Sequence, residues 1–243
     1  SGNEKKKLLK DSKAYFIRYI DNWDTEKPTA FWYVIKDRYT DMKEFSGNTR
    51  NKIRRGLKHN MVRRAETYEL MEEGYEVYRR AYERYDTFIK PMNESEFVER
   101  YRQGNDTRYE YWGVFCKYSE KMVGYTEVQI LEDSAHLKVI KFHPNYLKSY
   151  ISYALFYQLI NHYLHKRNFR YLSNGTRNIS HDTNIQNFLE EKFQFRKAYC
   201  TLHIFYRPIV KAVINLFYPF RNVIHKIPLK FSQKLSVLLI QED

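Results

Sequence analysis

The chain has 243 residues, 43% of them hydrophobic and 17% aromatic, with 42 lysines and arginines against 29 acids, a formal net charge of +13. This composition is typical of a folded chain and excludes intrinsically disordered, fibrous and collagen-like proteins. The 8 glycines form neither a G-x-G-x-x-G motif nor a Walker A motif, so nucleotide binding through those two loops is also excluded.

The positive charge is concentrated in three segments. Residues 49–64 carry +7 and residues 207–234 carry +6, both without an acid, and residues 1–10 carry +3. Such segments attract anionic partners, which include phosphorylated cofactors, nucleic acid and lipid head groups. The alternative interpretation of each segment is a solvated helix face.

The two cysteines, Cys116 and Cys200, form no C-x-x-C pair and lie in apolar segments. We expect both to be reduced core residues of a cytoplasmic protein. The eight histidines are scattered, so no metal site is predicted. The longest apolar stretch, 209–220, is interrupted by Lys211 and is shorter than the roughly 20 residues that a membrane-spanning helix needs.

The first half of the chain alternates strands and helices. Apolar residues at helical spacing predict amphipathic helices, and short β-branched or aromatic runs predict strands. Asn93 and Glu96 form a capping box that predicts where one helix begins. The expected elements are a strand over 30–35, a helix over 49–58, a strand over 61–65, a helix over 70–85 and a helix over 93–102.

The second half is predicted to begin with an antiparallel meander of three strands. Pro144 ends the third strand, and apolar spacing predicts a long central helix from about Lys148. A T-x-x-Q box at Thr183 predicts the start of another helix, and a parallel crossover through the central helix follows from the order. The expected elements are strands over 111–117, 122–131 and 135–142, a short strand at 171–172, and a final strand over 195–206.

Two segments carry a resemblance to a known family. Residues 142–155, FHPNYLKSYISYAL, resemble the loop with which GNAT acyltransferases wrap the pyrophosphate of acetyl-CoA, and residues 184–195, NIQNFLEEKFQF, resemble a second segment of that family. The resemblance implies an α+β fold, with a mixed, mostly antiparallel central sheet, helices on both faces and two splayed parallel strands. It also implies acetyl-CoA or another acyl-CoA as cosubstrate.

The resemblance assigns a cofactor loop that departs from the family pattern. Leu147 stands where the family has Arg or Gln, and Tyr150 and Ser152 stand at its two glycine positions. In the family, small residues let backbone N–H groups at a helix N-terminus approach phosphate oxygens. The residues implied as cofactor-binding are Leu147, Lys148, Ser149, Tyr150, Ile151, Ser152 and, on the pantetheine arm, Asn184.

A second resemblance concerns residues 30–58, a strand followed by a basic helix. This unit is similar to the segment that precedes the GNAT core in Fem-type transferases, a branch whose members also lack the glycine loop. Some members take an aminoacyl group from tRNA. The resemblance therefore implies an alternative donor, aminoacyl-tRNA, to which the basic helix would be suited.

Acyl transfer to an amine needs a general base. Many GNAT members keep a glutamate on the strand before the loop, and the corresponding position here falls near His136, whose ordinary pKa suits this role. Glu127 is the second candidate. Strand alternation places it on one face with Tyr125 and Gln129, which predicts either the lining of an acceptor cleft or a solvated face. His136 is equally consistent with a structural hydrogen bond to the backbone.

The polar loop from Ser173 to Asn184 offers further contacts. Arg177 and His181 are candidate substrate-binding residues. The tail after Pro208 has a basic amphipathic pattern, which predicts packing onto the core or a dimer partner, or contact with a membrane surface.

The chain is expected to have three parts, with the first packed on the core formed by the second. They are a basic β-α extension at 1–60, a GNAT-like domain at 61–206 and a basic amphipathic tail at 207–243. The expected function is transfer of an acetyl or similar acyl group from acyl-CoA to a small-molecule or lipid-linked amine, such as a sugar or cell-envelope precursor. The alternatives are aminoacyl-tRNA-dependent transfer, and an inactive module that binds anionic membrane or nucleic acid.

Overall fold

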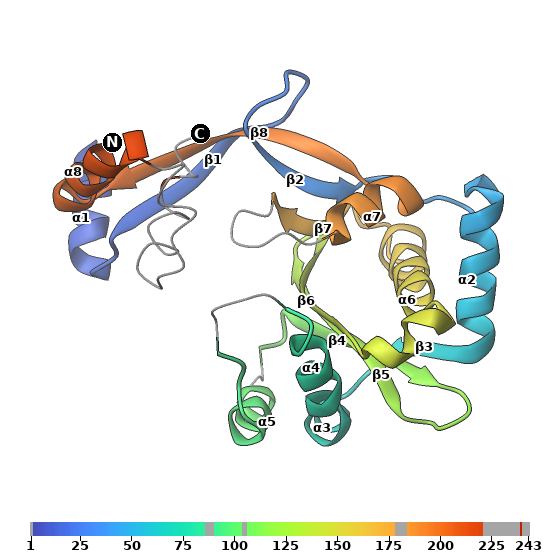
Figure 1. The fold of residues 1–243 in the computed structure, drawn as a ribbon. Helices are drawn as coiled ribbons and strands as arrows, with labels where there is room; N and C mark the ends of the chain where they lie inside the picture. The colour runs from blue at the N-terminus through green and yellow to red at the C-terminus, as the bar shows by residue number, and fades with distance from the viewer. Residues whose placement is uncertain (1, 86–89, 104–105, 178–183, 221–238, 240–243) are drawn as a thin grey trace. The chain divides into compact units, whose positions relative to one another are not determined.

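The computed structural model describes residues 2–85, 90–103, 106–177, 184–220 and 239 (Figure 1). Its internal contacts divide the chain into two compact units. The first comprises Ser1–Tyr33, Thr176–Thr183 and Lys197–Asp243, and the second comprises Val34–Gly175 and Asn184–Arg196. This division does not test the three expected domains, which remain a prediction.

The first unit is built on a two-stranded antiparallel ribbon. Strand β1 (Phe16–Thr25) pairs with β8 (Arg196–Tyr206), starting from Phe16 opposite Tyr206. Helices α1 (Gly2–Ser12) and α8 (Pro208–Phe217) lie at one end of the ribbon (Figure 1). The sequence pattern did not predict α1 or β1, because β1 has no clean alternation and most of its residues are exposed or half-buried.

The second unit is a sheet with helices on both faces. Helices α2 and α6 pack against each other and α6 packs on β3 and β4, whereas α4 packs on β5 and β6. Strand β2 leads into this unit from the first. The elements are β2 (Phe31–Lys36), α2 (Gly47–His59), β3 (Asn60–Arg64), α3 (Thr67–Glu69), a π-helical turn (Leu70–Gly74), α4 (Tyr75–Tyr82), α5 (Glu94–Arg102), β4 (Tyr109–Cys116), β5 (Met122–Leu131), β6 (Ser134–Phe142), a 3-10 turn (Pro144–Ser149), α6 (Ile151–Ile160), a second π-helical turn (Asn161–Lys166), β7 (Tyr171–Thr176) and α7 (Ile185–Phe193).

Strand order in this sheet is β7-β6-β5-β4-β3. The three-strand meander β4–β6 is antiparallel, as predicted. Strand β3 pairs antiparallel with β4, and β6 is parallel to β7. The parallel pairing runs from Ser134 opposite Tyr171 to His136 opposite Ser173. Beyond that pair both strands continue, to Phe142 and to Thr176, without further pairing between their described residues. The α+β, GNAT-like sheet with splayed parallel strands is therefore confirmed.

The central helix starts later than predicted. Residues after Pro144 form a 3-10 turn, and Tyr150 takes the left-handed conformation (φ 58°, ψ 36°), with its N–H bonded to the carbonyl of Leu147. This residue redirects the chain, so α6 begins at Ile151 rather than near Lys148. Left-handed backbone favours glycine, and Tyr150 stands at a position where the GNAT loop has one.

The start of α6 is held closely against α2. A Cβ atom on Gly56 would lie 2.6 Å from the carbonyl oxygen of Tyr150 and 3.2 Å from Cβ of Ala154. Only a glycine allows this approach. Asn60 completes the junction, because its side-chain amide donates to the carbonyls of Gly56 and Ser149.

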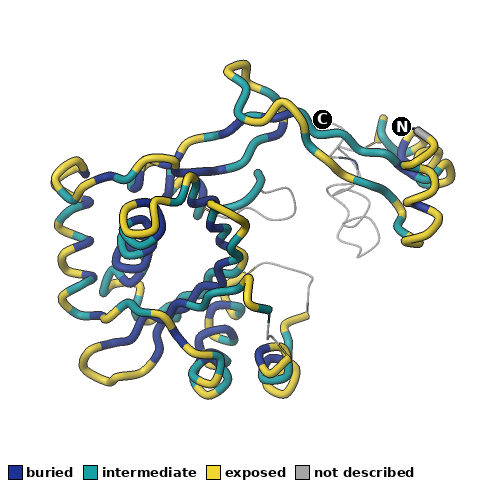
Figure 2. Tube along the Cα trace, turned by 180° about the vertical axis from the view of Figure 1, so that it is seen from behind, coloured by how far each residue is buried: buried dark blue, intermediate teal, exposed yellow. Residues whose placement is uncertain are grey.

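Buried residues lie on both sides of the sheet (Figure 2), and most of them are apolar. On α6, Ile151, Leu155 and Leu159 are fully buried, and on the opposite side Phe97 and Tyr125 belong to a second cluster. Both cysteines are buried free thiols. Within the part of the chain that the structure describes, no helix is both long enough and apolar enough to cross a membrane.

Helix α7 begins close to the expected T-x-x-Q box. Its N-cap residue is Asn184, whose side chain makes no cap hydrogen bond, and its first residue is Ile185. Thr183, which was expected to open this helix, lies outside the described residues. The helix buries Gln186, Leu189 and Phe193.

Candidate functional site

A row of polar residues crosses the sheet where β6 and β7 diverge. Gln129 on β5 lies opposite His136 on β6, and His136 lies opposite Ser173 on β7. Directly paired residues place their side chains on the same face of a sheet. The three side chains therefore share a face at the position where the pairing of β6 with β7 ends.

The imidazole of His136 is suited to accept a proton. It is half-buried, and its Nε2 lies 3.0 Å from the hydroxyl oxygen of Ser134. Burial lowers the pKa of His136 below its ordinary value, and the charge of Lys138 lowers it further. At neutral pH the ring is accordingly neutral, which is the state a general base requires. Its assignment as the base remains a prediction.

Glu127 is buried rather than solvated. Only 4% of the residue is exposed, so the solvated-face interpretation was wrong. The hydroxyl of Tyr101 donates to Oε1 at 2.6 Å, and Arg100 donates to Oε2 at 2.8 Å. Burial raises the pKa of Tyr101, which keeps its hydroxyl protonated as a donor. The candidate substrate residue Tyr125 is also buried, packed against Tyr101 and Phe97.

These contacts show that Glu127 has a structural role. Arg100 and Tyr101 both belong to α5, so the carboxylate ties that helix to β5. Both oxygens already accept hydrogen bonds, which leaves less of the carboxylate for a substrate proton. The sequence pattern did not identify Arg100 or Tyr101, because neither is part of a motif and their contacts to β5 form only in the folded chain.

The loop that is predicted to bind the cofactor lies against the basic helix α2. The guanidinium of Arg55 lies 4.8 Å from the centre of the Tyr150 ring, and its Nη1 donates to the Tyr150 hydroxyl at 3.3 Å. Lys52 lies 5.4 Å from the ring centre of Tyr153. Cation–π contacts of this kind hold the Tyr150 ring toward α2 and bring two cations to the start of α6.

The other loop residues are placed as follows. Leu147 and Lys148 are exposed, and the hydroxyl of Ser149 donates to the carbonyl of Tyr146. Ser152 lies in the first turn of α6, after the buried Ile151. The N-cap residue Tyr150 makes no side-chain cap bond. The N–H groups of a helix's first turn have no intrahelical acceptor, so they are suited to bind phosphate oxygens.

The structure describes two of the three remaining predicted residues. Asn184 is exposed at the start of α7. Arg177 belongs to the first unit, where its guanidinium lies 5.7 Å from the Trp32 ring centre. His181 lies outside the described residues. No group of three or more His, Cys, Asp or Glu side chains suited to a metal ion occurs among the residues that the structure describes.

Lys141, which the sequence analysis did not single out, lies on β6 opposite Tyr125. Its ammonium group lies 5.8, 5.2 and 4.4 Å from the ring centres of Tyr78, Tyr82 and Tyr85, and donates to the Tyr85 hydroxyl at 3.2 Å. Burial lowers the pKa of Lys141 to about 8. A neutral amine is therefore accessible on this side of the sheet just above neutral pH.

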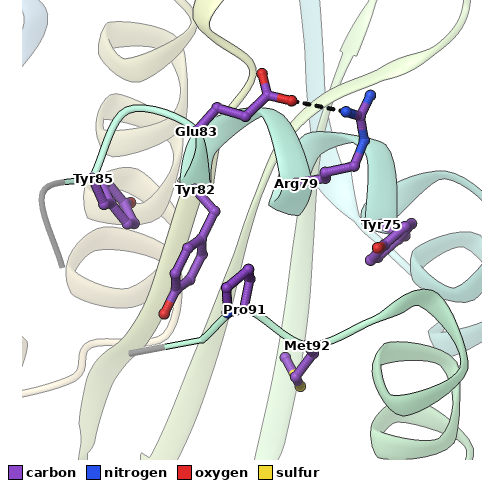
Figure 3. Close-up of a pocket in the computed structure, with 7 residues that line it drawn as sticks. All are labelled: Tyr75, Arg79, Tyr82, Glu83, Tyr85, Pro91 and Met92. Carbon is purple, nitrogen blue, oxygen red and sulfur yellow. Dashed lines mark hydrogen bonds and ion pairs between the residues drawn. The ribbon is translucent and has the colours of Figure 1, made fainter. Parts of the chain in front are cut away.

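A pocket of about 250 Å³ adjoins this tyrosine cluster on α4 (Figure 3). Arg79 and Glu83 form an ion pair at its rim (2.8 Å), and the rings of Tyr75, Tyr82 and Tyr85 form its apolar wall. The pocket combines an ion pair with aromatic rings, and its volume lies below the roughly 300 to 1,000 Å³ of typical small-molecule sites.

The buried Lys141 predicts a specific pH dependence of stability. Its folded pKa of about 8 lies below the value near 10.4 of an unfolded chain, so between these values the unfolded state binds more protons and stability rises with pH. Lys141→Met removes this titration. We expect the stability of the wild type relative to Lys141→Met to rise by roughly 2 to 3 kcal/mol from pH 7.5 to pH 10. Urea unfolding at both pH values measures this, and a constant difference would contradict it.

Comparisons with known proteins identify relatives by fold. No protein-family model matches the sequence, and no curated protein matches it. Among solved structures, FemX superposes over 88% of this chain and 77% of its own, with a TM-score of 0.64 and 12% identity. L-PGS from Bacillus licheniformis superposes over 98% and 70%, with a TM-score of 0.52 and 14% identity.

A third structure has the same fold. The C-terminal DUF2156 domain of an Agrobacterium fabrum protein superposes over 86% of this chain and 68% of its own, with a TM-score of 0.51 and 12% identity. Identities this low show a shared fold alone. The chain thus has the fold of FemX and L-PGS, and its chemistry has to be argued from its own residues.

Proposed function

We propose that the chain is an acyltransferase that moves an acyl group from acyl-CoA to an amine, with the reacting carbonyl held at the divergence of β6 and β7. The observation that carries this proposal is the end of parallel pairing at His136 and Ser173. A neutral imidazole, that of His136, lies where the two strands stop pairing. A thioester that enters there meets a candidate base for the acceptor amine.

The loop at the start of α6 supports a phosphate-bearing donor. Tyr150 keeps the left-handed backbone that a glycine would adopt, and its ring is held toward α2 by Arg55. The exposed Lys148 and the first-turn N–H groups supply a cation and donors for a diphosphate. The acceptor amine would be a small molecule or a lipid-linked precursor.

A second donor, aminoacyl-tRNA, is favoured by the basic helix α2. Arg50, Arg54 and Lys58 recur along it at a spacing of four residues, and the helix has no acidic residue. The fold of FemX covers most of this chain, and Fem-type proteins are the branch in which the sequence resemblance implies an aminoacyl donor. Both donors carry an activated carbonyl, an ester in aminoacyl-tRNA and a thioester in acyl-CoA. Either carbonyl would react where β6 and β7 diverge.

A titration of thermal stability with acetyl-CoA, CoA and tRNA separates the two donors, because a ligand that binds only the folded state raises its melting temperature. We expect acetyl-CoA and CoA to raise it. Stabilisation by tRNA alone would assign the Fem-type donor. If none of the three raises the melting temperature, the proposed transfer is contradicted and the alternative of an inactive binding module is favoured.

The loop chemistry predicts opposite effects for two neighbouring substitutions. Lys148→Glu is expected to weaken CoA binding by about 1 to 3 kcal/mol, the scale of a charge-assisted phosphate contact. Tyr150→Gly is expected to leave CoA affinity unchanged or improved, because glycine adopts the same backbone conformation and opens the loop. Isothermal titration calorimetry measures both. Lys192→Glu, on α7, is a matched charge control. A CoA affinity that neither loop substitution changes would mean that CoA binds elsewhere.

A further inference from the structure

Helix α8 of the first unit exposes a continuous row of large apolar side chains. We call Ile209, Val213, Leu216 and Phe220 the apolar stripe. Their exposed fractions are 73%, 39%, 66% and 58%. The residues recur at three- and four-residue spacing from α8 into the short 3-10 turn that follows, so they lie on one side of the helical segment.

The apolar stripe is separate from the side of α8 that packs on its own unit. Ile214 is 1% exposed and forms a cluster with Tyr206 and Leu239, and Val210 and Phe217 pack against the same cluster. The helix therefore has two apolar sides. One side packs on the cluster of its own unit. The other side is exposed, and Lys211 and Asn215 are exposed beside it.

Cationic residues gather around this helix. Arg207 joins α1 to the start of α8, because its Nη2 donates to the carbonyl of Leu9 at 2.6 Å and its N–H donates to the carbonyl of Tyr15. Helix α1 carries three exposed lysines, Lys6, Lys7 and Lys10, and lies beside α8 (Figure 1). Within the described residues 207–220, Arg207 and Lys211 are basic and no residue is acidic.

We propose that this face of the first unit docks on an anionic phospholipid bilayer, with the apolar stripe inserted at the level of the head groups. Apolar side chains flanked by lysine and arginine fit the boundary between acyl chains and negative head groups. A second copy of this chain fits less well. Two such faces would bring like charges together, which opposes association. The inference does not depend on the proposed transfer reaction.

Flotation of the full chain with lipid vesicles tests the proposal. We expect the wild type to float with vesicles of phosphatidylcholine and phosphatidylglycerol at 3:1, and to float about tenfold less with phosphatidylcholine alone or in 0.5 M salt. Leu216→Asp and Ile209→Asp should each reduce binding to the anionic vesicles about tenfold or more. Tyr118→Asp, at a 78% exposed residue in the second unit, is the matched control and should bind as the wild type does.

The substituted side chains are exposed, so the variants should keep the wild-type melting temperature, and a folded variant that fails to bind supports the proposal. Absence of wild-type flotation would overturn it, as would equal binding by Leu216→Asp. Analytical ultracentrifugation tests whether a second copy of the chain covers the apolar stripe instead. A wild-type dimer that Leu216→Asp dissociates, without vesicle binding, would assign the apolar stripe to a second copy and overturn the lipid assignment.

Discussion

His136→Ala is expected to lower turnover by about 10²- to 10⁴-fold while leaving the fold intact, which is the range for loss of a general base. The physical reason is the position of the imidazole at the last pair of β6 and β7, together with its lowered pKa, which keeps it neutral. Release of CoA in the presence of the acceptor amine measures the rate. Circular dichroism and the melting temperature check that the variant is folded.

The pH profile separates a base from a residue that only supports the structure. With a lowered His136 pKa, the wild-type kcat/KM should remain high below the ordinary histidine value near 6.5 before it falls, and His136→Ala should lack that acidic limb. His165→Ala is the matched control, since this imidazole is exposed and stacks on Tyr39. Unchanged turnover in His136→Ala would return the residue to a structural role.

Local patterns were sufficient to predict most of the second unit. The capping box at Asn93 forms as expected, and the three meander strands have nearly their predicted bounds, because both features depend on neighbouring residues. Strand β1 was not predicted, because it depends on a distant part of the chain. Its mixed sequence becomes a strand only by pairing with β8, which is about 180 residues away in the chain.

The place of His136 in the sheet could be predicted from the sequence, but the contacts around the candidate residues could not, and their roles stay predictions. Counting back from the GNAT-like loop by the family spacing led to His136. The structure places this residue in the last pair of β6 and β7. The partners of Glu127 and Tyr150 were not predictable, because Arg100 and Arg55 reach them from helices whose packing no local pattern specifies. The left-handed backbone at Tyr150 is a further example, since the residue type alone argues against it.

Glu127→Ala is expected to destabilise the fold by about 2 to 4 kcal/mol. Removal of one partner of a buried charged pair costs roughly 3 to 5 kcal/mol, and the lower range applies here because the side chain of Arg100 is 46% exposed. The Tyr101 hydroxyl would also lose its acceptor within a buried cluster. Urea unfolding at 25 °C measures the change, with Glu99→Ala on α5, whose side chain is 46% exposed, as the control.

The conservative substitution Glu127→Gln decides between the two roles of this carboxylate. Glutamine keeps the shape and can still accept from Tyr101, but it loses the charge that attracts Arg100. With both oxygens of Glu127 already bonded to α5, we expect Glu127→Gln to lose about 1 to 2 kcal/mol of stability and to keep its turnover at temperatures where it is folded. A folded Glu127→Gln protein that has lost turnover by about 10²-fold or more would make Glu127 the base instead of His136, because glutamine cannot accept the proton.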